Sequence, residues 1–143
     1  MKYTPQRMCF LCVVFICLSF CLGSCYSRKE LAYYADATNY IHATGRVHHI
    51  QYSDDMSEMY LGLSDLPPEF QDTNFKIVGK NLEIVQMRGI DEKLKIGDEI
   101  SFVAAPLYLG DGYVVPIVAI TVRGETLLDF TDGFENLQEW LNR

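Results

Sequence analysis

The first 25 residues and the rest of the chain differ in how hydrophobic and polar residues are arranged. After the polar opening MKYTPQR, residues 9–23 (CFLCVVFICLSFCLG) contain no charged residue. Charge returns at once in SRKE, and from there apolar residues recur at the short spacings of helices and strands. A helix that crosses a bilayer needs about 20 consecutive apolar residues. The shorter run, with a positive start and small residues at its exit, predicts a secretory signal peptide.

Alternation of apolar and polar residues predicts five main strands beyond this leader. In EMYLGLSDL, Met59, Leu61 and Leu63 fall on one side, and in VVPIVAITV we expect Val118, Ile120 and Val122 to face together. Pro116 lacks a backbone donor, so it should lie at a strand start, an edge or a bulge. The strand-like segments are YIHATGRVHHIQYS, EMYLGLSDL, NFKIVG, EISFVAA and YVVPIVAITV.

Helical spacing of apolar residues predicts three helices. The first covers residues 28–39, where Ser27 and Glu30 match a capping box. The second follows NFKIVG, with Asn81 as its cap and Gly89 as its stop. The third lies in DGFENLQEWLNR, where Asp132 and Glu135 resemble a capping box. Its apolar stripe consists of Phe134, Leu137, Trp140 and Leu141.

The order strand, strand, strand, helix, strand, strand is that of the OB-fold, a small Greek-key barrel. ATGRVHHIQY resembles the first strand of that family, and LKIGDEISFV resembles the loop and fourth strand after its helix. The resemblance covers residues 40–122. It implies a mainly β (α+β) protein: a five-stranded OB-like Greek-key barrel with a helix between strands 3 and 4 and flanking N- and C-terminal helices. An open antiparallel sheet with helices is the alternative.

All five cysteines lie in the first 25 residues. Leu22-Gly23-Ser24-Cys25 resembles the lipobox of bacterial lipoproteins, in which an aliphatic residue and two small residues precede the lipidated cysteine. The resemblance implies cleavage between Ser24 and Cys25 and a diacylglycerol on the Cys25 sulfur. Two acyl chains give stable anchoring where one is marginal. The alternatives are an ordinary Cys25 after an uncleaved anchor, and a metal cluster of the other cysteines, which no acidic residue or histidine accompanies.

These features divide the chain into a signal peptide at 1–24, a lipidated cysteine with a short tether at 25–30, and one OB-like barrel domain at 31–143. Loss of Lys2 and Arg7 with the leader changes the formal net charge from −7 for the whole chain to −9 for the remainder. This acidity disfavours nucleic acid as a partner, because basic patches on phosphates supply most of that affinity. The expected location is the exported face of the cell membrane.

Candidate catalytic and metal-binding residues are few. Beyond Cys25 the chain has no thiol, no Gly-x-Ser-x-Gly elbow, no phosphate loop and no His-Glu-x-x-His motif. His48 and His49 are neighbours and should face opposite ways in a regular strand, and His42 lies six positions earlier. We therefore expect no metal site, no cofactor and no catalytic residue.

Tyrosine is abundant, with eight of the nine tyrosines located after the leader. OB-type barrels bind ligands on the face of strands 2 and 3 and between the 1–2 and 4–5 loops. This places candidate ligand-binding residues at Tyr52, Tyr60, Tyr108 and Tyr113. A tyrosine offers a flat apolar face and a hydroxyl. The alternative is that these rings cover the edges of the core.

Three functions are compatible with the sequence. The first is a membrane-anchored cell-envelope lipoprotein that is not an enzyme and binds a protein or small ligand through its loop rim. The second is an accessory factor or hydrolase acting on envelope polysaccharide, which would need two carboxylates about 5–10 Å apart. The third is an OB-type nucleic-acid binder, by analogy of fold alone. The oligomeric state is open.

Overall fold

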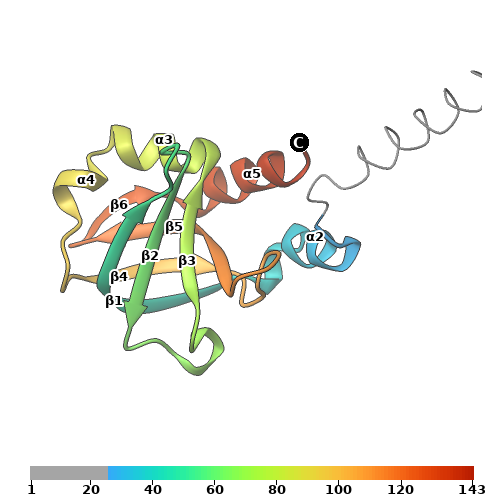
Figure 1. Ribbon diagram of the computed structural model, residues 1–143, viewed down its shortest axis with the longest axis horizontal. Helices are drawn as coiled ribbons and strands as arrows, with labels where there is room; N and C mark the ends of the chain where they lie inside the picture. The colour runs from blue at the N-terminus through green and yellow to red at the C-terminus, as the bar shows by residue number, and fades with distance from the viewer. Residues whose placement is uncertain (1–25) are drawn as a thin grey trace, which may run out of the picture.

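A computed structural model describes residues 26–143, which form a closed β-barrel flanked by helices (Figure 1). The strand order is β3-β2-β1-β4-β5-β6, and an additional parallel pairing joins β3 to β5 and closes the barrel over the first five strands. The strands are β1 (Ile41–Tyr52), β2 (Glu58–Ser64), β3 (Asn74–Val78), β4 (Glu99–Ala104), β5 (Val114–Val122) and β6 (Glu125–Leu128). The OB-like fold class is confirmed, and β6 is an additional strand paired with the end of β5.

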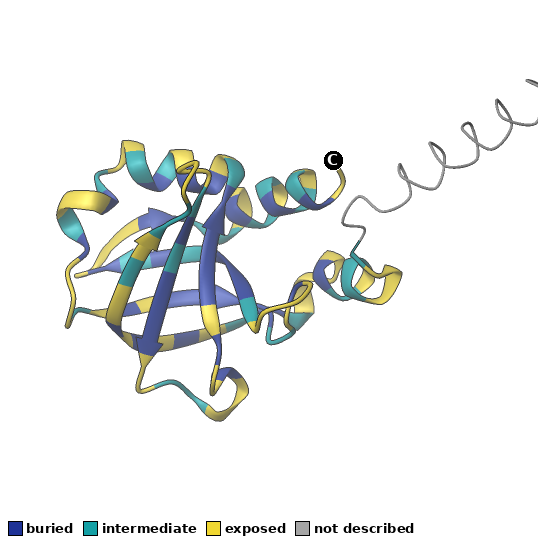
Figure 2. Ribbon diagram, in the orientation of Figure 1, coloured by how far each residue is buried: buried dark blue, intermediate teal, exposed yellow. Residues whose placement is uncertain are grey.

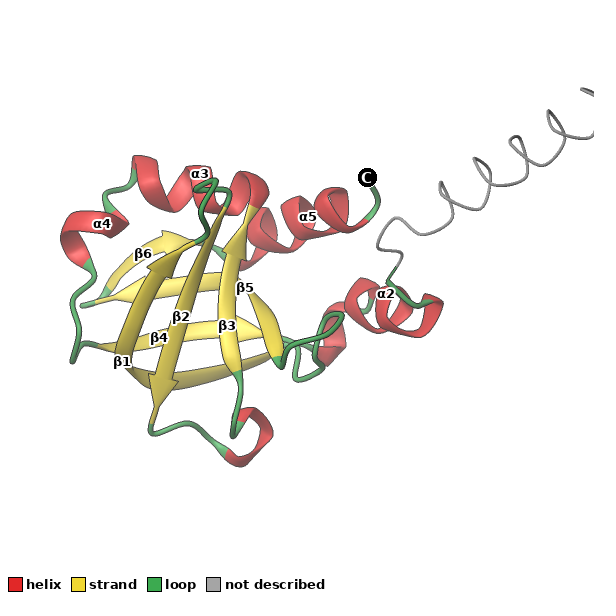
Figure 3. Cartoon of the chain, viewed as in Figure 1, coloured by secondary structure: helices red, strands yellow, loops and turns green. Residues whose placement is uncertain are grey.

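The helices occupy the expected places in the chain (Figure 3). α2 (Arg28–Ala35) precedes the barrel, α3 (Gly79–Met87) and α4 (Ile90–Lys93) lie between β3 and β4, and α5 (Phe130–Leu141) closes the chain. Two 3-10 turns, Ala37–Asn39 and Pro68–Phe70, lie in the connections. Residues 28–30 are the first turn of α2, where the helix predicted over residues 28–39 was expected to begin.

The barrel interior is filled by large apolar side chains, and Figure 2 colours much of the strand ribbon as buried. At its centre Phe75 lies 4.8 Å from Phe102 and 5.5 Å from Phe70, measured between ring centroids, and all three rings are buried. Tilted and edge-on aromatic pairs at this separation add attraction to the burial of area. The alternation of β2 produces this packing, because Met59, Leu61 and Leu63 all face inward.

A second apolar cluster lies outside the barrel, where α2 and α5 cover β4 and β5. Tyr34 is fully buried here, and its hydroxyl donates to the Leu107 carbonyl. The Tyr40 hydroxyl donates to the Tyr34 carbonyl at 2.7 Å. The stripe of α5 packs into this cluster as expected, through Phe134, Leu137, Trp140 and Leu141. The N-terminal helix is therefore part of the folded domain.

Two helix starts differ from those expected from the sequence. α5 begins earlier, because Asp129 is its cap and accepts from the Asp132 N–H at 3.0 Å. Asn81 does not cap α3, since the helix begins at Gly79. Asn81 is buried and donates instead to the Gly133 carbonyl of α5 at 2.9 Å. An earlier local cap thus replaces the one expected for α5, whereas Asn81 is used in a contact between two helices.

Strand β5 contains a bulge that the alternation pattern could not show. Ala104 pairs with Ile117 and Val103 with Ala119, so Val118 is the extra residue. As a result Val118 belongs to the outer cluster, whereas Ile120 and Val122 face the barrel core. The expectation that all three face together is wrong for Val118. Pro116 lies near the strand start, opposite Lys76 of β3.

Candidate binding groove between β3, α2 and the β4–β5 loop

Three polar side chains meet on the outer face of β2 and β3. The register pairs Tyr60 with Lys76, and Glu58 lies two residues before Tyr60 on the same face. The Lys76 ammonium is 3.2 Å from the Glu58 carboxylate, and the Tyr60 hydroxyl donates to the other oxygen of that carboxylate. The Lys76 side chain is only 11% exposed and that of Glu58 22%. This ion pair is therefore largely shielded from water.

Two aromatic rings, one just before α2 and one near the end of α5, complete this face. The Lys76 ammonium lies 5.0 Å from the centre of the Trp140 ring, within the range of a cation–π contact. On α5, Trp140 also lies against Tyr26, with 6.0 Å between ring centroids. Tyr26 is the first residue that the structure describes. The end of α5 and Tyr26, two residues before α2 begins, thus meet beside Lys76 of β3.

The start of α2 is bonded to the β4–β5 loop through Glu30. Ser27 and Glu30 form the expected capping box: the Ser27 N–H donates to Glu30 at 2.7 Å, and the Ser27 hydroxyl accepts from the Glu30 N–H at 3.2 Å. The second oxygen of the Glu30 carboxylate accepts from the Gly110 N–H at 2.9 Å. One carboxylate therefore fixes both the helix start and the loop tip.

Between these elements lies a groove of about 470 Å³. We call it the β3–α2 groove. Its walls are β3, the start of α2 and the loop between β4 and β5. Its lining residues are Tyr26, Ser27, Glu30, Lys76, Leu109, Gly110 and Asp111.

The protonation states in and beside the groove follow from these bonds. Hydrogen bonds from the Ser27 side chain, then from the Gly110 and Ser27 N–H groups, lower the pKa of Glu30. The hydrogen bond to Glu58, with burial, raises the pKa of Tyr60 to about 12. Burial first, and then the charges of Glu58 and Glu30, raise the pKa of Tyr26. At neutral pH the groove presents an ionised Glu30 beside neutral phenol groups.

The predicted tyrosines of the β4–β5 loop form a pair. Tyr108 and Tyr113 meet edge to face with 5.1 Å between ring centroids. Tyr113 is 65% exposed and has a φ of 58°, a region that large side chains rarely adopt. Its carbonyl accepts from the Asn74 N–H at 3.0 Å, which ties the loop to β3. An exposed aromatic ring held in a disfavoured backbone conformation is a candidate for function.

The four predicted tyrosines do not form one site. Tyr60 lies beside the groove with Lys76, and Tyr108 and Tyr113 lie on the loop that forms its wall. Tyr52 is separate, because its hydroxyl donates to Asp91 beyond α3. The predicted lipidation and cleavage residues, Ser24 and Cys25, lie outside the described residues.

The histidines correct one expectation. The β1–β2 register shifts between Val47 and His49, so His48 is the extra residue of a bulge. Both His48 and His49 are exposed, and a Cβ placed on Gly62 would lie 2.7 Å from the His48 ring and 2.9 Å from the His49 Cβ. The two side chains therefore share the outer face over Gly62. Within residues 26–143, no group of three or more His, Cys, Asp or Glu side chains is arranged to hold a metal ion.

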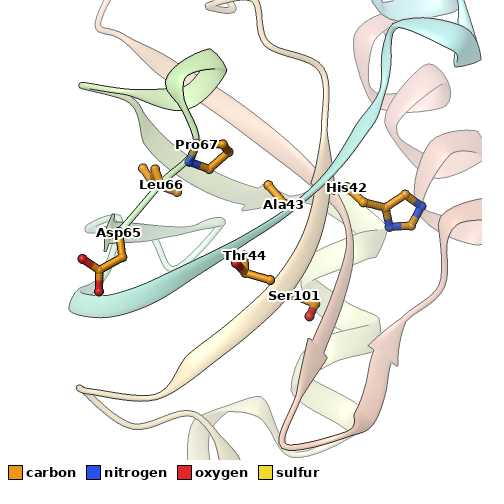
Figure 4. Close-up of a pocket in the computed structure, with 7 residues that line it drawn as sticks. All are labelled: His42, Ala43, Thr44, Asp65, Leu66, Pro67 and Ser101. Atoms are coloured by element: carbon orange, nitrogen blue, oxygen red, sulfur yellow. The ribbon is translucent and has the colours of Figure 1, made fainter.

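A second hollow lies on another part of the barrel surface, where the loop after β2 meets β1 and β4 (Figure 4). Its volume is about 580 Å³. The sticks of Figure 4 show short side chains such as Thr44 and Ser101 along its floor, with His42 at one end and Asp65 at the other. It contains none of the predicted site residues. Among the described helices, none is long and apolar enough to cross a bilayer.

Sequence reasoning missed four residues of the groove region: Tyr26, Glu58, Lys76 and Trp140. Alternation on β2 and β3 is sufficient to place Glu58, Tyr60 and Lys76 on outward positions. The pairing of Tyr60 with Lys76 depends on the strand register, which alternation alone does not fix. Trp140 was recognised only as part of an apolar stripe, and nothing in the sequence signals its contact with Tyr26.

Comparisons with protein-family models, with curated proteins and with solved structures give no match for this chain. The fold class therefore rests on the strand order and register described above. They define a closed five-stranded mixed β-barrel with one additional strand, a helix between strands 3 and 4 and a C-terminal helix.

Proposed function

We propose that this chain is a lipid-anchored binding module of the bacterial cell envelope, displayed on the exported face of the membrane. In this proposal the β3–α2 groove and the Tyr108–Tyr113 loop bind a protein or small ligand. The position of the groove supports this, because OB-type barrels bind ligands on the face of strands 2 and 3 and beside the 4–5 loop. The observation that carries the proposal is the packing of Tyr26, the residue after Cys25, against Trp140 within this region.

The carboxylates of the groove region favour binding over hydrolysis. A glycosidase needs one carboxyl group with a raised pKa to act as an acid. The pKa of Glu30 is lowered, and both of its oxygens accept backbone N–H bonds. Glu58 is paired with Lys76 and accepts from Tyr60. Both carboxylates are therefore held by bonds within the protein and are not arranged as an acid and a base across a cleft.

The anchor is tested by metabolic labelling with a fatty-acid analogue. Wild-type protein should incorporate the label, and Cys25→Ala should not, because its alanine has no sulfur to carry a diacylglycerol. Cys21→Ala is the matched control, since it removes a thiol from the same segment and should leave labelling unchanged. Label retained by Cys25→Ala would rule out the proposed attachment point.

The binding surface is tested by photo-crosslinking in intact cells. A photoreactive residue at Asp111, on the groove wall, should capture a partner, whereas the same residue at the exposed Met87 of α3 should not. Tyr60→Ala or Tyr113→Ala should reduce capture at position 111 about tenfold, the effect of losing one well-placed aromatic contact.

Both tyrosine variants should keep a melting temperature within about 3 °C of wild type, as is usual for surface substitutions. Tyr60→Phe separates the ring from its hydroxyl bond to Glu58. Equal capture at positions 111 and 87 would contradict the proposed surface. A large loss of melting temperature in Tyr60→Ala would show that this ring belongs to the core.

A further inference from the structure

No linker residues separate the folded domain, which begins with Tyr26, from the proposed anchor at Cys25. Tyr26 is joined to Cys25 by one peptide bond, which separates their Cα atoms by about 3.8 Å. Tyr26 itself is packed on Trp140, and Ser27 already belongs to the capping box of α2. If Cys25 carries acyl chains, as the proposed function states, the surface around Tyr26 must lie at the level of the lipid headgroups.

Two free cations lie on this surface. Arg28 and Lys29, in the first turn of α2, are exposed and form no ion pair with any residue of the described part of the chain. Most cations elsewhere in residues 26–143 are paired with a carboxylate, namely Arg46, Lys76, Lys80, Lys93 and Arg123. Arg28 and Lys29 are neighbours in the chain, whereas the other cations without an ion pair in this range, Arg88, Lys95 and Arg143, are separated along it.

Helix stability does not explain these cations. The positive end of the helix dipole lies at the N-terminus, so a basic residue in the first turn is unfavourable there. Arg28 and Lys29 occupy the first two positions of α2, where acidic residues would stabilise the helix. Their neighbour Glu30 supplies such an acid and also bonds to Gly110. The cations thus act against the local preference of the helix.

The acidic groups of this end are largely engaged. Glu30 accepts from two backbone N–H groups. Glu139 of α5 is paired with Lys80, and the charge of Arg143 lies close enough to help lower the Glu139 pKa. Asp111 lies on the groove wall. Arg28 and Lys29 are thus two exposed cations without an ion-pair partner among residues 26–143, on a strongly acidic domain.

Aromatic rings accompany the cations. Tyr26 and Trp140 are both partly exposed and in contact. The Gly110 backbone is also close to Tyr26: a Cβ on Gly110 would lie 3.4 Å from its ring. Tyrosine and tryptophan are enriched at the headgroup level of membranes, because each has an apolar body and a polar tip. Cations together with such rings match the chemistry of an anionic lipid surface.

We propose that Tyr26, Arg28, Lys29 and Trp140 form a seating surface that rests on anionic phospholipid headgroups and holds the domain in one orientation. This proposal depends on the lipid anchor but not on the ligand of the groove. The same lipids repel the acidic remainder of the domain, and this repulsion keeps the end opposite α2 away from the membrane surface. In Figure 1 that far end is the loop after α4, on the opposite side of the barrel from α2.

The test uses the full lipidated protein in vesicles, with Trp140, the only tryptophan of the chain, as the probe. Brominated phosphatidylcholine is included at a fixed fraction as a quencher. Vesicles of phosphatidylglycerol with phosphatidylethanolamine should give strong quenching of Trp140, and vesicles of phosphatidylcholine weak quenching. Raising the salt from about 0.1 M to about 1 M shortens the screening length from about 10 Å to about 3 Å and should remove the difference.

Lys29→Glu should lower the ratio of molecules whose seating surface contacts the lipid to those in which it does not by about tenfold, because it reverses one charge at the lipid surface. Lys95→Glu is the matched control, with the same change of net charge at an exposed lysine near the far end. It should leave quenching unchanged. Equal quenching in the two vesicle types, or equal effects of the two variants, would overturn the seating surface.

The outcomes separate this proposal from the proposed function. Intact mass of the vesicle-bound protein reports whether acyl chains are present. If they are absent, the anchor itself fails, and the seating surface fails with it. If they are present and Lys29→Glu does not affect quenching, only the seating surface fails. Photo-crosslinking at position 111 tests the groove independently of both.

Discussion

Replacing Phe102 with alanine should remove a large part of the stability of the domain. Phe102 is 1% exposed and lies 4.8 Å from Phe75 and 5.5 Å from Phe70 at the centre of the barrel. A buried Phe→Ala change typically costs about 3–5 kcal/mol, since it loses apolar burial and leaves a cavity. Small domains have total stabilities of about 5–15 kcal/mol. All five cysteines lie in residues 1–25, so no disulfide within the barrel offsets the loss.

The expected result is a fall in melting temperature of about 12–20 °C, measured by circular dichroism together with denaturant unfolding. Ser101→Ala is the matched control, because Ser101 is the neighbouring residue of β4 and is exposed. It should change the melting temperature by no more than about 2 °C. Phe102→Leu should fall between the two. A Phe102→Ala protein as stable as wild type would show that the three phenylalanine rings do not form the centre of the core.

Replacing Gly133 with alanine should have the next largest effect, through a clash rather than a cavity. A Cβ on Gly133 would lie 1.7 Å from the Val118 carbonyl oxygen, so α5 would have to move away from β5. Alanine is favoured over glycine inside a helix by about 1 kcal/mol. The free-energy cost of displacing α5 is larger than this gain, because overpacking against a fixed backbone costs about 3 kcal/mol or more. We therefore expect a net loss of about 2 kcal/mol or more in the free energy of unfolding.

This loss should appear as a fall in melting temperature of about 8 °C or more. Glu135→Ala is the control, since Glu135 lies on the same helix, where its side chain caps nothing, and should tolerate the change. In Gly133→Ala the emission of Trp140 should also shift, because α5 carries this ring against Tyr26. If Gly133→Ala raised the melting temperature, helix propensity would outweigh the contact, and α5 would not pack closely on β5.

The sequence was sufficient to predict the fold class because each strand carries a clear alternation or apolar run. The β1, β2 and β4 segments appeared where expected, and the helix between strands 3 and 4 separated two groups of strands as in OB-type barrels. The Ser27–Glu30 capping box also formed as predicted, because all of its partners lie within one helical turn. Sequence patterns that depend only on residues close together in the chain therefore predicted the local structure correctly.

The differences arose where distant segments decide the local structure. The bulges at His48 and Val118 insert one residue into a strand, which changes the side that the following residues face. Asn81 looked like a helix cap, but it bonds to Gly133 on a helix that lies more than fifty residues later. A single sequence carries no local signal for these pairings.

The same reasoning explains what could be predicted of the candidate site. Tyr60, Tyr108 and Tyr113 were found because OB-type barrels use a known face and a known loop. Tyr26 and Trp140 were not found, because their contact joins the two ends of the described chain. Lys76 was overlooked because one lysine on a short strand is usually a solvated surface residue, whereas here it is shielded by Glu58 and Trp140.

The attachment of α2 to the domain has a mechanical consequence. This helix is joined to the barrel through the outer cluster and the Glu30–Gly110 bond, not through strand pairing. A pulling force applied at Cys25 would therefore break these contacts one after another and detach the helix from the barrel. The strands would resist the force for longer, because it would act on many interstrand hydrogen bonds at once. Residues 26–40, once extended, would release about 50 Å of chain. Under tension, the unwound helix would lengthen the segment between Cys25 and the barrel and leave the barrel folded.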